Sequence, residues 1–172
     1  HIASDKAMID TFLAGGDIHK TTAAQVFGVP ENEVTPKMRS YAKAVNFGIV
    51  YGISEFSLAE DIGVSRAEAK AYIESYLDHF SGVKEYMTEI KERAKKDGYV
   101  TTLFGRRRYL PELKSSNFNT RSFGERVALN TPIQGTAADI IKIAMIRVDK
   151  RLQKENLNAK LILQVHDELI IE

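Results

Sequence analysis

Residues 36–52 read PKMRSYAKAVNFGIVYG, and this stretch decides the fold that we expect for the chain. Thr35 precedes a proline, and a hydroxyl side chain followed by proline at the first helical position is a typical helix start. Ala42, Val45 and Ile49 then recur at helical spacing. The sequence therefore predicts a helix over residues 36–52 with one face that packs against a core.

The other face of this helix carries a row of side chains suited to binding. Its members, each four residues apart, are Arg39, Lys43, Phe47 and Tyr51. Each step of four turns the position by only about 40°, so the row forms one slowly turning stripe. Cations bind phosphates, and planar rings stack on bases with about 1–3 kcal/mol per base. The stripe fits a nucleotide, although an amphipathic helix with a solvated cationic edge and core aromatics has the same pattern.

Gly48 lies inside the same predicted helix, beside Phe47. Glycine at an interior helical position costs about 1 kcal/mol relative to alanine. We therefore expect another group to approach the helix backbone at this point.

A second candidate phosphate contact lies upstream of this helix. Asp17 has the position of an N-cap for a helix that continues to about Phe27, and His19 lies in its first turn. Backbone N–H groups at a helix start favour anions, so His19 is a candidate phosphate contact. A histidine without any role in binding is the alternative.

Capping residues and glycines divide most of the remaining chain into helices. Ser65 and Glu68 form a capping box, and Gly98 follows the last turn of a later helix. Apolar residues return at helical spacing further along, at Ile133, Ala137, Ile140, Ile141, Ala144 and Val148. The predicted helices cover residues 3–13, 18–27, 65–80, 83–97 and about 120–153, the last with an interruption near Pro132 and Gly135.

Two segments have a β-branched and aromatic composition, which predicts two short strands or a hairpin in the first and a hairpin in the second. Residues 99–111 read YVTTLFGRRRYLP, and residues 161–172 read LILQVHDELIIE, in which His166 and Asp167 separate two apolar runs. A carboxylate at a hairpin turn is well placed to hold a divalent metal, because strand pairing fixes it and the turn exposes it. Asp167 is therefore a candidate metal ligand, although an aspartate in a plain tight turn gives the same pattern.

Arg126, Asn130 and Gln134 form another row at steps of four. These residue types reach acceptor atoms on base edges and sugars, and the minor-groove acceptors are similar for every base pair. Such a row could hold a duplex without reading its sequence, whereas a polar helix surface is the alternative. Basic residues outnumber acidic ones between residues 106 and 126, which is compatible with a nucleic-acid groove.

The composition excludes several other classes of protein. The chain has 172 residues, of which 44% are hydrophobic and 27% charged, as in an ordinary globular domain. The absence of cysteine excludes disulfides, Cys-ligated zinc and thiol catalysis. The longest stretch without a charge, residues 127–138, is shorter than the about 18 apolar residues that a membrane span needs. Since His1 is not an initiator methionine and the chain stops in an apolar run, we expect a piece of a longer protein.

The separate signals also occur together in one order. The string RSYAKAVNFGIVYG fits the pattern Arg-x3-Lys-x3-Phe-Gly-x2-Tyr-Gly, and TPIQGTAAD and LQVHDEL follow it along the chain. Together with DIHKTTA and TLFGRRRYLP, these motifs closely resemble the family A DNA polymerases over essentially all 172 residues.

The resemblance implies a role in nucleotide binding for the first set of candidates. His19, Arg39 and Lys43 would hold the phosphates of the incoming nucleotide, and Lys43 would also count among the catalytic residues. Phe47 would pack against the base and sugar, and Tyr51 would occupy the templating position until the fingers close.

The resemblance also implies DNA contacts and a metal site. The implied DNA contacts are Arg106, Arg107, Arg126, Asn130, Gln134, His166 and Glu168. Asp167 would be the catalytic carboxylate that binds Mg²⁺ in a two-metal mechanism. The second catalytic aspartate would lie outside this chain, because no motif resembling DYSQIELR occurs in it.

The implied fold is α+β and predominantly helical. Fingers helices would occupy about residues 15–120, and part of the palm, with a long helix and the metal-binding hairpin, about residues 121–172. The implied reaction is template-directed addition of deoxynucleotides from dNTPs to a primer 3′-hydroxyl with release of pyrophosphate, in DNA replication or repair. Primer–template DNA, dNTPs, the rest of the palm and the thumb would be the partners, with no membrane, in the bacterial cytoplasm at the nucleoid.

The same residues permit two rival interpretations. A noncatalytic helical module could bind nucleic acid with the fingers surface, and the isolated 172 residues are themselves expected to be inactive. A purely structural helical domain would leave Gly48 and the stripe of residues 39–51 unexplained.

Overall fold

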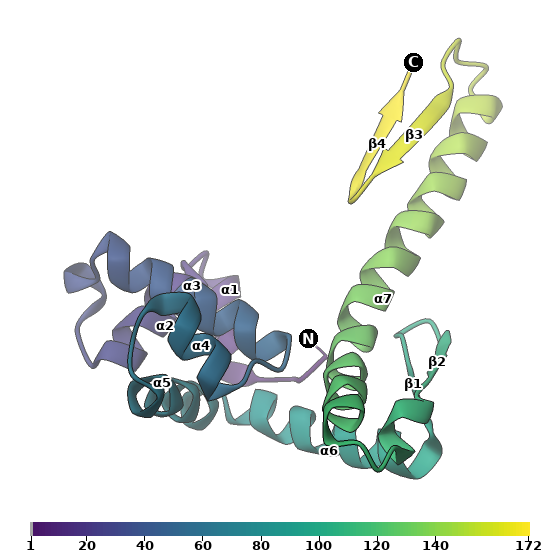
Figure 1. Ribbon diagram of the computed structural model, residues 1–172. Helices are drawn as coiled ribbons and strands as arrows, with labels where there is room; N and C mark the ends of the chain where they lie inside the picture. The colour runs from purple at the N-terminus through teal and green to yellow at the C-terminus, as the bar shows by residue number, and fades with distance from the viewer. Residues whose placement is uncertain (1) are drawn as a thin grey trace.

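The computed structural model describes residues 2–172, and most of them are helical (Figure 1). The elements in chain order are α1 (Lys6–Leu13), α2 (Ile18–Phe27), the short 3-10 helix η1 (Glu31–Glu33), α3 (Pro36–Val50), α4 (Glu55–Ile62), α5 (Arg66–His79), α6 (Ser81–Asp97), β1 (Tyr99–Thr101), β2 (Arg107–Tyr109), the 3-10 helix η2 (Pro111–Lys114), α7 (Phe118–Lys154), β3 (Leu161–Val165) and β4 (Glu168–Ile171). The expected α+β, mainly helical class is therefore confirmed.

Side-chain caps start the helices where the sequence predicts. Asp17 accepts hydrogen bonds from two backbone N–H groups of α2, and Thr35 accepts one from Met38 at the start of α3. Ser65 and Glu68 form the expected capping box of α5. The first helix begins at Lys6 instead of residue 3, because Asp5 is its cap and accepts from the backbone N–H of Met8.

The helix α4 was not expected from the sequence. It has eight residues, begins after a Ser54 cap and ends at Gly63, whose φ is +68°. Only Leu58 and Ile62 are buried along it, so its apolar pattern is too short to stand out from the surrounding sequence. It nevertheless supplies two members of the first core.

The first core joins α3 to the helices that follow it. Its buried members are Val45, Ile49, Leu58, Ile62, Ala69, Tyr76, Phe80 and Val83. The predicted packing face of α3 is confirmed, since Ala42, Val45 and Ile49 are all buried. The stripe of binding side chains consequently faces away from this core.

A second core lies where α6 crosses α7. Its buried members are Ile90, Ala94, Val100, Leu110, Leu113, Ala128 and Leu129. The helix α6 therefore contributes to both cores, with Val83 in the first and Ile90 and Ala94 in the second.

Both predicted hairpins form. The strands β1 and β2 pair antiparallel with Tyr99 opposite Tyr109, and β3 and β4 pair with Val165 opposite Glu168. This register leaves His166 and Asp167 as the two turn residues of the C-terminal hairpin. Asp167 therefore lies at the turn as expected.

The long helix α7 forms as predicted, and the residues it buries are not those of its apolar repeat. The expected interruption does not end the helix, which continues through Pro132 to Lys154. Its buried residues are Gly124, Ala128, Leu129, Pro132, Thr136 and Asp139, which are mostly small or polar. The reason is close packing: a Cβ added to Gly135 would lie 2.7 Å from the Thr102 side chain.

The second half of α7 and the last hairpin form an arm, defined as residues 140–171, that extends from the helical body (Figure 1). Ile140, Ile146 and Ile162 are each more than half exposed in this arm. In the described residues 2–172, no helix is both long and apolar enough to cross a membrane.

Candidate functional site

The stripe on α3 is open to solvent and meets His19 of α2. Arg39 and Lys43 are exposed, and the Phe47 ring is 48% exposed. The Lys43 Nζ atom lies 5.8 Å from the centre of the Phe47 ring, and the His19 ring centre lies 5.7 Å from the same point. The structure thus brings two predicted phosphate-site side chains, Lys43 and His19, around one aromatic ring.

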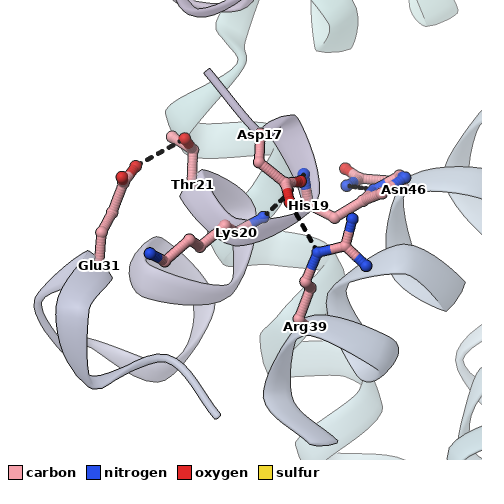
Figure 2. Close-up of polar contacts among 7 residues, drawn as sticks. All are labelled: Asp17, His19, Lys20, Thr21, Glu31, Arg39 and Asn46. Atoms are coloured by element: carbon pink, nitrogen blue, oxygen red, sulfur yellow. Dashed lines mark hydrogen bonds and ion pairs between the residues drawn. The ribbon is translucent and has the colours of Figure 1, made fainter. Parts of the chain in front are cut away.

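Arg39 is held by a carboxylate that sequence reasoning treated only as a helix cap. The Arg39 Nε atom lies 2.7 Å from Asp17 Oδ2, while Asp17 also caps α2 (Figure 2). This hydrogen bond from Arg39 lowers the pKa of Asp17 below its usual value. Both side chains are more than a third exposed, so solvent weakens the pair and Arg39 can exchange Asp17 for another anion.

His19 is fixed by two residues that sequence reasoning did not identify. The Asn46 Nδ2 atom lies 2.8 Å from His19 Nδ1 (Figure 2), and the hydroxyl of Thr22 donates to Asn46 Oδ1 over 3.1 Å. Burial lowers the pKa of His19, and the nearby Arg39 and Lys43 lower it further, against the opposing effect of Asp17. Asn46 is buried on α3 and follows His19 by 27 residues, so no local sequence pattern indicates this contact.

The group that approaches Gly48 comes from the same chain. A Cβ added to Gly48 would lie 2.8 Å from Cγ2 of Ile53. Gly52 has φ +70°, which turns the chain back so that the Ile53 N–H donates to the Gly48 carbonyl. The glycine is thus explained by internal packing, and it lends no support to a ligand beside Phe47.

The row on α7 begins beside the end of α3. A Cβ added to Gly52 would lie 3.1 Å from Arg126 Cγ, and Arg126 borders a hollow of about 460 Å³ together with Lys91 and Asn119. Gln134 is exposed, whereas Asn130 is partly buried. Within residues 2–172, the Asn130 Oδ1 atom is shielded and has no hydrogen-bond partner. The first member of the row therefore lies close to the binding stripe.

Two arginines of the first hairpin make contacts inside the protein. Arg106 Nε lies 2.7 Å from Asp139 Oδ1, and Arg106 Nη2 donates to the Gly135 carbonyl over 3.0 Å. The Arg107 guanidinium lies 4.8 Å from the centre of the Tyr99 ring. Arg106 therefore ties the β1–β2 turn to α7, and a DNA contact by either arginine stays a prediction.

The turn of the last hairpin presents its side chains to solvent. His166, Asp167 and Glu168 are exposed, and His166 has φ +51°, a conformation that glycine usually fills at such a turn. The Gln164 side chain donates to the His166 carbonyl. The hairpin lies at the far end of α7 from α3 (Figure 1), so the chain alone does not bring Asp167 to the stripe.

These residues do not by themselves form a metal site. Within residues 2–172, no three His, Cys, Asp or Glu side chains gather closely enough to hold a metal ion. Asp167 offers one carboxylate, and a divalent cation needs further oxygen ligands.

Comparison with known proteins gives consistent matches over the whole chain. A family model described as DNA polymerase family A matches residues 1–172. DNA polymerase I of Bacillus caldotenax is 59% identical over 172 residues, and that of Bacillus subtilis (strain 168) is 58% identical; each match covers 100% of this chain and 20% of the relative. A solved POL domain of Pol1 from M. smegmatis, in complex with DNA primer-template and dNTP, matches with a TM-score of 0.91 and 48% identity, over 100% of this chain and 30% of that one. The chain thus spans about a fifth of the length of these curated relatives.

Proposed function

This chain belongs to DNA polymerase family A, and we propose on that premise that it forms the fingers and part of the palm of a template-directed DNA polymerase. The observation that carries the proposal is the outward stripe of α3, joined by His19 around the Phe47 ring. The reaction is addition of a deoxynucleotide from a dNTP to a primer 3′-hydroxyl with release of pyrophosphate. About residues 15–120 serve as fingers and about residues 121–172 as palm.

Within the proposed site, each member of the stripe meets a different part of the nucleotide. Arg39 and Lys43 hold the phosphates, since charge-assisted hydrogen bonds are the strong ones. Binding of the triphosphate draws Arg39 from Asp17, which is a solvent-exposed partner. Phe47 packs against the base and sugar, and Tyr51 occupies the templating position before closure.

Primer–template DNA lies along α7 in this proposal. Arg126, Asn130 and Gln134 contact the duplex near its minor groove, where acceptors are similar for every base pair. The exposed Arg107 lies near the template backbone, together with the part of the Arg106 guanidinium that Asp139 and the Gly135 carbonyl do not bind. His166 and Glu168 support the primer end.

Asp167 contributes one ligand to a divalent-metal site, with Mg²⁺ as the proposed ion, that carboxylates outside these residues complete. Such a metal pair, when bound, would activate the primer hydroxyl and stabilise the leaving phosphates. The partners of the chain are therefore primer–template DNA, dNTPs, and the rest of the palm and the thumb. Chromosomal DNA as substrate implies a bacterial cytoplasmic location at the nucleoid.

Replacement of Lys43 tests the proposal in the complete polymerase. Lys43→Ala removes a charge-assisted contact of about 1.5–3 kcal/mol, so single-turnover incorporation should fall by about 10- to 150-fold. Lys37→Ala is the matched control, because Lys37 lies on the same helix outside the stripe, over Tyr41. Unchanged incorporation by Lys43→Ala, or an equal loss in both variants, would contradict the phosphate role.

A further inference from the structure

The contact between Asn46 and His19 is buried and belongs to a short chain of hydrogen bonds. Thr22 is fully buried on α2, and Asn46 is 8% exposed on α3. The Thr22 hydroxyl donates to Asn46 Oδ1, and Asn46 Nδ2 lies 2.8 Å from His19 Nδ1. The stripe itself makes no use of Thr22 or Asn46, so their arrangement needs another explanation.

The direction of these bonds decides where His19 carries its proton. An amide nitrogen has only donors, so when Asn46 Nδ2 faces His19 Nδ1 over 2.8 Å, that ring nitrogen must accept. A proton on Nδ1 would place two donors against each other. With the Asn46 amide in this orientation, the form of His19 that fits is the neutral imidazole with its proton on Nε2, because an imidazolium or an Nδ1–H tautomer would face another donor.

We propose that Asn46, oriented by Thr22, is a positioning residue that holds His19 neutral with Nε2–H as its only donor, and that this donor is directed to a phosphate oxygen of the nucleotide. The inference rests on the proposed function of the stripe. Within residues 2–172, the Nε2 atom makes no hydrogen bond, so it remains available to a ligand. His19 thus adds a directed donor to a site whose charge comes from Arg39 and Lys43.

The charged groups around His19 agree with a neutral ring. Asp17 lies at the cap of the same helix, and Arg39 and Lys43 face the ring from α3. Burial is the largest cause of the lowered pKa of His19; Asp17 opposes it, and Arg39 and Lys43 lower the pKa further.

The proton position can be measured directly. In the complete polymerase labelled with ¹⁵N-histidine, the His19 signals are assigned as those lost in His19→Gln. We expect an unprotonated Nδ1 and a protonated Nε2 at neutral pH. Asn46→Asp replaces the amide donor with an acceptor, so Nδ1 should become protonated and the ring should remain charged to a higher pH. A protonated Nδ1 in the unchanged protein, or identical His19 signals in Asn46→Asp, would overturn the proposal.

Kinetics test whether this orientation matters for nucleotide use. Asn46→Ala and Thr22→Val should each weaken apparent dNTP binding, the former by about tenfold, and neither should add to the loss in His19→Gln. Thr21→Val is the matched control, since Thr21 is the neighbouring residue on α2 and bonds to the exposed Glu31 instead. Full additivity of Asn46→Ala with His19→Gln would overturn the positioning role.

Loss of the phosphate role of His19 and loss of the positioning role of Asn46 give different results. If His19→Gln leaves incorporation unchanged, the phosphate role of His19 fails, and with it the ligand part of the inference. Thermal unfolding of each variant identifies a loss of dNTP binding that comes only from destabilisation of the fold. If Asn46→Ala is destabilised in this way, Asn46→Asp, which keeps the size of the side chain, still reports the protonation of His19 in the NMR spectrum.

Discussion

The helical body and the C-terminal arm contain similar apolar residues but bury them very differently. In the body, Leu58 and Phe80 are fully buried between helices, whereas Ile146 and Ile162 in the arm are each 56% exposed. The body therefore builds its own core, and the arm does not. Exposed apolar surface of this kind marks an interaction site, which is consistent with the proposed contact to the rest of the palm.

The proposed site is divided in the same way. His19 and the stripe of α3 are held from behind by buried side chains, as the contact from Asn46 shows. Asp167 is held only by a two-stranded hairpin, and such a hairpin is at best marginally stable by itself in water. We infer that nucleotide-binding geometry is built into this chain, whereas metal-binding geometry depends on what covers the arm.

The largest expected effect is a loss of primer extension, without a loss of stability, when Asp167 in the arm is replaced. In the complete polymerase, Asp167→Asn keeps the shape of the side chain but removes the charge that holds a cation, so primer extension should fall by about a thousandfold or more. Because Asp167 is exposed, the free energy of unfolding should change by less than about 0.5 kcal/mol. Primer extension and denaturant unfolding measure the two effects.

Asp149→Asn is the control for loss of a carboxylate in the same arm. Asp149 lies on α7, and within residues 2–172 its side chain accepts a hydrogen bond from Gln153 alone. Near-normal extension by Asp167→Asn, or extension by the isolated 172 residues with Mg²⁺, would refute the assignment of Asp167.

A pair of core truncations tests the difference in burial itself. Phe80 packs against the rings of Tyr76 and His79, with centres 4.8 and 4.6 Å away, so Phe80→Ala should lower the free energy of unfolding by about 3–5 kcal/mol. Ile146→Ala in the exposed arm should change it by no more than about 0.5 kcal/mol in the 172-residue chain. Equal losses in urea unfolding would show that the arm has a core of its own.

Gly48 tests how tightly the body is packed around α3. In Gly48→Ala the new Cβ would lie 2.8 Å from Ile53 Cγ2, and overpacking costs about 1–3 kcal/mol against a helix-propensity gain of about 1 kcal/mol. We expect a net loss of about 1 kcal/mol that Ile53→Ala partly relieves. A double-mutant cycle on the free energy of unfolding measures this coupling, and strict additivity would contradict the packing explanation.

The smallest effect concerns the contact that joins the first hairpin to α7. Hydrogen bonding from Thr102, together with the Arg106 guanidinium, lowers the pKa of Asp139. A carboxyl group whose pKa is lower in the folded than in the unfolded chain stabilises the fold. This contribution to the free energy of unfolding is complete above the ordinary aspartate pKa of about 3.9, and it is lost as the pH falls through the lower pKa of the folded chain. In Asp139→Asn, the free energy of unfolding should therefore fall less steeply below about pH 4 than in the unchanged chain, with Asp149→Asn as control. An unchanged slope in acid titration of stability would contradict this role.

Local patterns made much of the fold predictable, because caps and helical spacing act within a few residues. The start of α3 at Thr35 and the hairpin turn at Asp167 follow from such signals. The buried face of α7 does not, since it depends on the approach of Thr102 to Gly135 across 33 residues. The apolar repeat in the sequence therefore predicts that α7 is a helix but does not identify the side that packs.

The candidate site shows the same division. The stripe was predictable because its members lie one helical turn apart. The partners of His19 were not, since Asn46 follows it by 27 residues and only packing of α2 against α3 brings them together. Asp139 likewise lies 33 residues from Arg106, and nothing local indicates that pair.

The position of α6 has a consequence for how the body opens. Its 17 residues span about 25 Å, with Val83 in one core and Ile90 in the other, so neither core can come apart without exposing part of this helix. The two cores should therefore melt in a single cooperative step. Amide protons in the middle of α6 should exchange with deuterium among the slowest in the chain, at a rate set by global unfolding, while those of the arm exchange through local opening.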